Sequence, residues 1–231
     1  MKTTWLDYAL STTLIAMLLT LSVGAVAMIA PHLRAVCGDY HVLLELVAVM
    51  LLYGVSSAFL VRGLLRFRPI APGNYNEDSP VFAYWKLITV VYRLGQGALR
   101  PFTPFFFVPV VDAIYGARIG RDVAFGGEIN DPYFVSVGDG TTLGTHTIIS
   151  GSFTGGGVLT CGTVRIGRNV TVGPNATIFP GTEIGDGATV MIGSCVMPGT
   201  FIPAGETWRG NPARKWTQSK GAAPAPLVDL A

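Results

Sequence analysis

Residues Ile166 to Trp208 read IGRNVTVGPNATIFPGTEIGDGATVMIGSCVMPGTFIPAGETW, and in this stretch an apolar residue returns at every sixth position. Small and turn-forming residues fill the places between, so each six-residue unit predicts a short strand that ends in a bend. A repeat of fixed period outweighs local secondary-structure signals. Three units, or 18 residues, make one triangular coil. The apolar positions are Ile166, Val172, Ile178, Ile184, Val190, Val196, Ile202 and Trp208.

The same step runs upstream through Ile119, Phe125, Val137, Leu143 and Ile149, with Asp131 as the one polar occupant of a core position. Asp131 marks either a local bulge or an exception made for a site. From Ile149 to Ile166 is 17 residues, so the glycine-rich segment 150–165 predicts a loop that leaves the coil. Stacking about five coils pairs their backbones at ~4.8 Å and buries one apolar residue per side, which predicts a left-handed parallel β-helix over 114–216.

The N-terminal third of the chain has the composition of a membrane protein. Of the 231 residues, 50% are hydrophobic and only 13% are charged. Uncharged residues 8–31 and the apolar run 42–63 each suffice to cross a hydrocarbon layer of ~30 Å. A signal peptide is the competing interpretation of the first run, but the run is longer than a signal core and a second span follows directly. We therefore expect a two-helix transmembrane hairpin over 1–68.

The distribution of basic residues predicts the orientation of this hairpin. Arg62, Arg66 and Arg68 follow the second span, whereas Arg34 in the connecting loop is offset by Asp39. Under the positive-inside rule both termini face the cytoplasm, and the β-helix lies on the cytoplasmic side of the inner membrane. The net charge of +2 forms no aromatic-interleaved basic patch, so we expect no nucleic-acid partner.

Residues 69–113 predict a linker and an interfacial helix. Ser79 suits the N-cap and Pro80 the first turn of a helix over 81–100. Lys86, Arg93 and Arg100 share one face of this helix, while aromatic residues fall toward the other, which is typical of a helix on a membrane surface. The alternative is a helix packed on the β-helix as a lid. Phe102 and Phe105–Phe107 predict an extended apolar strip at the bilayer interface, and 217–231 a flexible tail.

The repeat ends in Gly210-Asn211-Pro212-Ala213-Arg214, and over 114–216 it resembles the hexapeptide acyltransferase family. A closer resemblance is to the membrane-embedded C-terminal condensing domains of poly-lysine-type peptide synthetases, where three units of two helices and a hexapeptide domain occur in one chain. The resemblance implies transfer of an acyl group from coenzyme A or a carrier-protein thioester to a hydroxyl or amine. The segments that carry it are Thr103-Pro104-Phe105, Gly116-Ala117-Arg118-Ile119-Gly120-Arg121, Val137-Gly138-Asp139 and Thr145-His146.

His146 is the one histidine of the predicted β-helix. A lone histidine is often structural, but the resemblance implies a single histidine acting as general base, a role that suits imidazole at neutral pH. One coil is 18 residues, so Glu128 is expected in register with His146, where a carboxylate would orient the ring. Glu128 at a solvated turn is the alternative. Asn130 and Asp131 lie between these rungs and are candidates to hold the acceptor.

The last coils are the candidate donor site. Gly193, Ser194, Gly210 and Ala213 are small enough for a pantetheine arm to lie along the backbone, and Arg209, Arg214 and Lys215 could meet phosphates. The resemblance places coenzyme A at this end; without it these residues are surface bases. Cys195 and Ser194 have no histidine nearby in sequence, so neither is favoured as a nucleophile. The cysteines Cys37, Cys161 and Cys195 have no ligand spacing, and we expect reduced thiols.

The family resemblance also implies an assembly and its alternatives. Members form trimers with active sites between subunits, so we expect a homotrimer in the lipid bilayer, with a carrier protein or synthetase as a further partner. A γ-class carbonic anhydrase needs three zinc-binding histidines, which this domain does not contain, so no metal is expected. A non-catalytic trimeric membrane scaffold is the remaining alternative.

Overall fold

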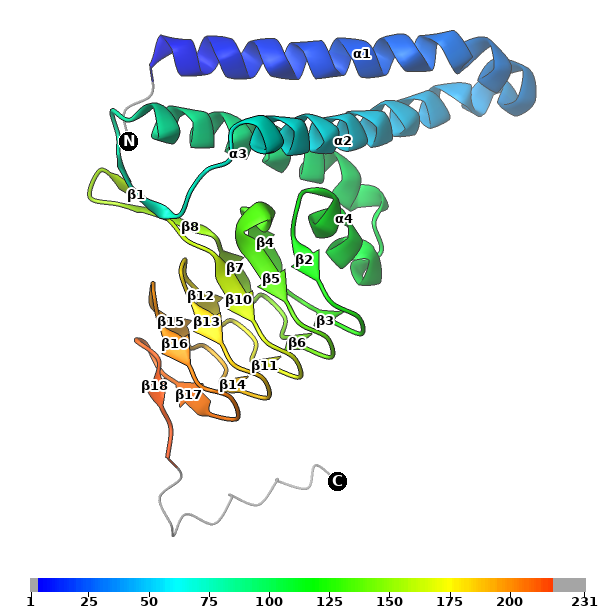
Figure 1. The fold of residues 1–231 in the computed structure, drawn as a ribbon. Helices are drawn as coiled ribbons and strands as arrows, with labels where there is room; N and C mark the ends of the chain where they lie inside the picture. Colours follow the sequence, from blue (N-terminus) through cyan, green and yellow to red (C-terminus); the bar gives the residue numbers. More distant parts are fainter. Residues whose placement is uncertain (1–3, 218–231) are drawn as a thin grey trace, which may run out of the picture.

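Parallel strands form the three walls of a left-handed β-helix, as the repeat predicts (Figure 1). In the computed structural model, which describes residues 4–217, four coils are complete and a fifth is partial. The first wall holds β2 (Arg118–Ile119), β5 (Val135–Val137), β10 (Val164–Ile166), β13 (Glu183–Ile184) and β16 (Phe201–Ile202). The second holds β3 (Ala124–Phe125), β6 (Thr142–Leu143), β11 (Thr171–Val172), β14 (Thr189–Val190) and β17 (Thr207–Arg209), with β18 (Arg214–Lys215) antiparallel to β17. The third holds β4 (Glu128–Asn130), β7 (Ile148–Ser150), β12 (Thr177–Ile178) and β15 (Cys195–Val196).

Each strand of the later coils buries its predicted apolar residue. Ile178, Val190 and Ile202 are 0% exposed, and Ile166 pairs with Ile184 across one coil step. The turns close where glycine or asparagine can adopt positive φ, for example Asn169 and Gly187. The interior of the prism is therefore a dry column of Ile, Val and Leu.

The first coil departs from the six-residue step. Its core residue on the third wall is Ile129, which is 0% exposed and pairs with Ile149. The prediction that Asp131 occupies this core position was wrong. The turn Gly126–Gly127 is two residues shorter than its counterpart, and the 3-10 helix η4 (Pro132–Phe134) returns those residues, so the register is correct again at Val137.

The predicted loop at 150–165 is an ordered β-hairpin. Its strands are β8 (Ser152–Gly155) and β9 (Val158–Cys161). β9 also pairs antiparallel with β1 (Gly73–Asn76), which lies in the segment expected to be a linker. The hairpin therefore ties the coil to the chain that descends from the helices (Figure 1).

The N-terminal residues form two long helices that run side by side, α1 (Trp5–Cys37) and α2 (His41–Phe67), joined by the 3-10 turn η1 (Gly38–Tyr40) (Figure 1). Among residues 4–217, this stretch, Trp5–Phe67, is long and apolar enough to cross a membrane by length and composition. Most of its large apolar side chains are exposed, including Leu21 at 62% and Phe59 at 72%.

The predicted amphipathic helix is α3 (Pro80–Leu99), and Ser79 caps it by accepting from the backbone N–H of Phe82 at 3.2 Å. α3 lies between the helical pair and the first coil, which is the packing of the predicted lid (Figure 1). Its basic face is not a free surface, because Lys86 is 8% exposed and paired with Asp7.

The chain then enters the coil through short helices. The strip around Phe102–Phe107 is not extended as expected but forms η2 (Arg100–Phe102) and η3 (Phe105–Phe107), followed by α4 (Val108–Ile114). Phe105, Phe106 and Phe107 are exposed. The predicted tail, apart from Thr217, lies outside the described residues.

Candidate active site

His146 lies at the corner between the second and third walls, in the turn from β6 to β7. Its φ is +59°, its backbone N–H donates to Gly126 O at 2.9 Å, and its side chain is exposed. Left-handed backbone at a residue other than glycine is uncommon and is a reason to look for function. The imidazole is therefore presented to solvent at an edge of the prism rather than buried in its core.

The corresponding turn of the first coil has no counterpart of His146. Gly126 and Gly127 join β3 to β4 directly, and a Cβ on Gly126 would lie 2.9 Å from the backbone nitrogen of Thr145. A side chain at either glycine would collide with the second coil. The chain therefore passes closely beneath the His146 turn and leaves the edge open on the side of the helices.

The predicted register between Glu128 and His146 was wrong by two residues. Glu128 pairs with Ile148, and its backbone N–H donates to Thr147 O at 2.7 Å. The shortened Gly126–Gly127 turn is the cause, because it removes two residues from the 18-residue step. Among the described residues, no hydrogen bond joins the Glu128 carboxylate to the His146 ring.

Glu128 lies instead within electrostatic reach of an acidic group on α4. Burial raises the pKa of Asp112 to about 7, Arg100 opposes the rise, and the charge of Glu128 adds to it. Asp112 is 1% exposed, and its Oδ1 accepts from Gln96 Nε2 at 2.8 Å. This buried carboxyl group gave no signal in the sequence, because α4 itself was not predicted.

Asn130 and Asp131 are both engaged by α3. Asn130 Oδ1 accepts from Arg93 at 3.1 Å. Asp131 is 2% exposed and accepts from Trp85 Nε1 at 3.2 Å, from Tyr133 Oη at 3.0 Å and from the Ser152 hydroxyl. Burial raises its pKa, and these hydrogen bonds oppose the rise.

Asp131 thus joins α3, the first coil and the hairpin. It is neither a core exception of the coil nor an open side chain. A role for Asp131 in holding the acceptor stays a prediction that this placement does not favour. Asn130 is less buried and lies at the end of β4, so its role as an acceptor contact stays open.

The corner that carries His146 continues along the prism. Ile148 pairs with Thr177, so the residue equivalent to His146 on the third coil is Asn175, with φ of +56°. Thr177 pairs with Cys195, so the next equivalent residue is Gly193, with φ of +64°. The Gly210 carbonyl then accepts from the Cys195 backbone at 2.9 Å, so the exit segment crosses the same corner. Sequence reasoning missed Asn175 because the hairpin insertion hides the equivalence.

The other predicted donor residues are arranged unequally. Ser194 is 1% exposed, its hydroxyl points away from solvent and has no partner, so only its backbone is available to a ligand. Arg209 stacks over the Trp216 ring at 5.4 Å, and Lys215 pairs with Glu206. Arg214 is exposed and donates to Ala213 O at 3.2 Å. Three cationic groups therefore gather at the last coil, one of them already paired.

Clusters of three or more His, Cys, Asp or Glu side chains suited to a metal are absent from residues 4–217. Cys37, Cys161 and Cys195 are unpaired, and burial raises the pKa of Cys161 to about 12. Cys195 lies at the start of β15, next to the core residue Val196. The chemistry of the corner therefore depends on His146 and its neighbours.

No protein-family model and no curated protein matches the chain. Solved structures similar to it are hexapeptide-repeat acetyltransferases. A galactoside acetyltransferase in complex with coenzyme A has 28% identity and a TM-score of 0.41, covering 44% of this chain and 55% of that one. A hexapeptide-repeat acetyltransferase from Vibrio cholerae has 22% identity and a TM-score of 0.41, covering 45% and 62%.

A serine acetyltransferase from Brucella abortus has 16% identity and a TM-score of 0.37, covering 87% of this chain and 67% of that one. The chain thus spans less than two thirds of the length of the galactoside and Vibrio cholerae enzymes. With TM-scores below 0.5, these likenesses by themselves assign no activity to it.

Proposed function

We propose that the chain is a membrane-bound acyltransferase that moves an acyl group from a thioester donor to a hydroxyl or amine acceptor. The observation that carries the proposal is the alignment of His146, Asn175 and Gly193 along one corner, with the exit segment crossing the same corner. From the second coil to the fifth is roughly 14 Å at the usual strand spacing. An extended thioester arm can lie along this edge, with its carbonyl near His146 and its distal end near Arg209 and Arg214.

In the proposed reaction, the His146 imidazole takes the proton from the acceptor as its oxygen or nitrogen attacks the thioester carbonyl. The imidazolium then returns the proton to the thiolate that leaves. No covalent enzyme intermediate is needed. Glu128 would act at a distance by steadying the imidazolium, since the two groups are not hydrogen-bonded in this structure.

The assembly proposed is a homotrimer anchored by α1 and α2 in the inner membrane, with the β-helix on the cytoplasmic side. A solvent-exposed histidine at a prism edge has one wall to bind substrate, and a neighbouring copy would supply the second. The donor is coenzyme A or a carrier-protein thioester, and both would use the backbone of Gly193. A monomeric mass in mild detergent, or a C-terminal topology reporter that reads as exported, would contradict this arrangement.

The substitution His146→Asn tests the catalytic proposal. Asparagine adopts the left-handed turn, as Asn175 does, but removes the base. Acetyl-coenzyme A turnover with a panel of hydroxyl and amine acceptors should fall by at least about 100-fold. Wild-type turnover would leave the scaffold alternative. Glu128→Gln should lower the rate by less, about tenfold, and an unchanged rate would remove Glu128 from the mechanism.

A further inference from the structure

The helical layer contains two hollows that follow one another along the seam between α1 and α3. The first has a volume of about 350 Å³ and lies beside Asp7, Ser11, Trp85, Lys86 and Thr89. The second has a volume of about 250 Å³ and is lined by Leu19, Val49, Met50, Tyr53, Leu94 and Ala98. Ile15 lines both, so they form a single groove.

This groove is amphipathic along its length. The end near Asp7 carries an ion pair with Lys86 and several hydroxyl groups, whereas the end near Leu94 is lined almost wholly by hydrocarbon. From residue 7 to residue 19 of α1 the groove extends over about 18 Å at the helical rise. Because Asp7 and Lys86 neutralise each other, the polar end favours a head group without net charge.

Two hydroxyls in the groove wall are buried without a partner. Tyr53, 8% exposed, has no hydrogen bond from its hydroxyl, and neither has Thr89 Oγ1. Buried polar atoms are normally paired, and an orphaned one needs an explanation. An occupant of the groove with a carbonyl or hydroxyl oxygen near Thr89 would supply one.

The width of the groove decides what kind of molecule fits. A helix needs about 10–12 Å of diameter, which hollows of this volume do not offer, whereas a single hydrocarbon chain needs far less. The large apolar side chains exposed on α1 and α2 flank the groove, as they would in contact with lipid.

We propose that the groove between α1 and α3 is a binding site for one acyl chain of a lipid with an uncharged or zwitterionic head group. The chain lies against Ile15 and Leu94, and the head lies beside the Asp7–Lys86 pair. Trp85 lines the head-group end and donates to Asp131, so the site adjoins the first coil. This inference stands apart from acyl transfer, and its test measures binding alone.

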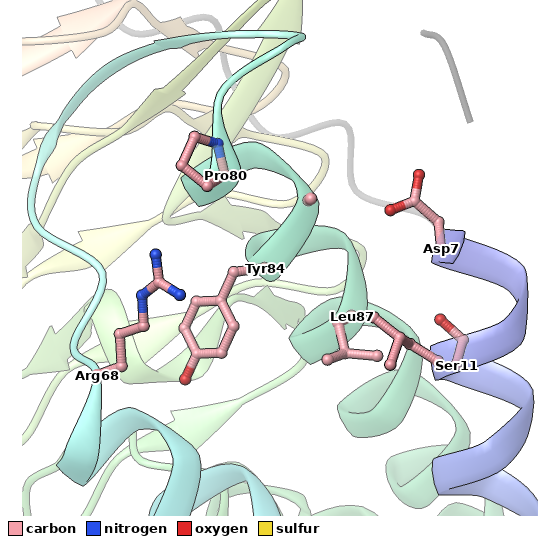
Figure 2. A pocket seen from close by; sticks show the side chains of 8 residues that line it. Asp7, Ser11, Arg68, Pro80, Tyr84 and Leu87 are labelled. Atoms are coloured by element: carbon pink, nitrogen blue, oxygen red, sulfur yellow. The ribbon is translucent and has the colours of Figure 1, made fainter. Parts of the chain in front are cut away.

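The opposite side of the same seam offers a matched control. Figure 2 shows this smaller pocket of about 200 Å³, with Arg68 and Tyr84 on one side and Asp7 and Ser11 on the other. Leu87 of α3 projects toward it, and Arg68 stacks over the Tyr84 ring at 5.4 Å. Leu87→Trp fills this pocket, whereas Leu94→Trp on the same helix fills the groove.

The experiment uses the purified full chain in mild detergent and lysophosphatidylcholine whose palmitoyl chain carries a photoreactive diazirine. After irradiation, mass spectrometry should find one label per chain, mapped to α1 and α3 around Ile15 and Leu94. Labelling should fall at least fivefold in Leu94→Trp, stay unchanged in Leu87→Trp, and be displaced by unlabelled lysophosphatidylcholine.

Thermal unfolding of each variant checks its folding, and Ile15→Phe replaces Leu94→Trp if that variant does not fold. Labels spread over the exposed faces of α1 and α2, equal in all variants, would overturn the proposal. So would the absence of label in the wild type, as expected if a helix of a second copy covers the seam. Loss of acyl transfer in His146→Asn has no bearing on either result.

Discussion

His146 and Asn175 occupy the same left-handed turn position on consecutive coils, with φ of +59° and +56°. Gly193 follows them on the fourth coil. Asparagine and glycine are common in this conformation because a short polar side chain or none tolerates it. A histidine here costs backbone strain without serving the turn.

The first prediction concerns that strain. His146→Gly should fold at least as stably as the wild type, because glycine adopts positive φ freely. His146→Ala should be less stable than His146→Gly by about 1 kcal/mol, because alanine keeps the Cβ clash and has no polar group to offset it. Denaturant unfolding of the two variants measures the difference. Equal stabilities would show that the turn relaxes out of the left-handed region.

The second prediction concerns Asp131, which holds α3, the first coil and the hairpin together. Asp131→Ala leaves buried donors of Trp85, Tyr133 and Ser152 unpaired, so the free energy of unfolding should fall by about 3 kcal/mol or more. Asp186→Ala removes an exposed pair with Arg168 and should cost less than about 1 kcal/mol. Similar losses in both variants would contradict the anchoring role.

The third prediction is a pH dependence from Asp112. Its pKa is raised from 3.8 to about 7, so the folded state binds this proton more tightly than the unfolded chain. The stability it contributes is fully present below about pH 4 and is lost as the pH rises toward 7, on the order of a few kcal/mol.

The variant Asp112→Asn should therefore show a flatter stability profile between about pH 4 and pH 7 than the wild type. Thermal unfolding across this range makes the comparison, and the other titrating groups are common to both proteins. A wild-type profile that coincides in shape with that of Asp112→Asn would mean that the group titrates normally when folded.

The fourth prediction concerns the contact between α2 and α3. A Cβ on Gly95 would collide with the Ser57 and Tyr115 hydroxyls, which are 2.6 Å apart in a buried hydrogen bond. Gly95→Ala should destabilise the helical layer by about 1–3 kcal/mol. Gly97→Ala, on the same helix with nothing within 4 Å of its Cβ, should stabilise it by about 1 kcal/mol. Protease resistance and thermal unfolding in detergent distinguish the two.

Where the period was unbroken, the sequence predicted structure residue by residue. From Ile166 to Trp208 one apolar residue per side must enter the interior, and a strand admits only one register that buries all of them. Ser79 and Pro80 likewise predicted the start of α3, because the cap and the first turn depend on neighbouring residues alone.

The site was less predictable. The distance from His146 to Glu128 depends on the length of a turn, and the sequence of Gly126–Gly127 does not reveal that two residues are missing until the strands on both sides are paired. The equivalence of His146 and Asn175 depends on how much chain the hairpin removes from the coil.

The sequence by itself determined the triangular coil, the apolar hairpin and the position of the single histidine at a turn, because each follows from a local period or run. Only the tertiary structure decided that Asp131 is an anchor under α3, that Lys86 pairs with Asp7, and that a groove separates α1 from α3. Those facts depend on contacts between segments distant in the chain, whose geometry is set by how whole elements pack.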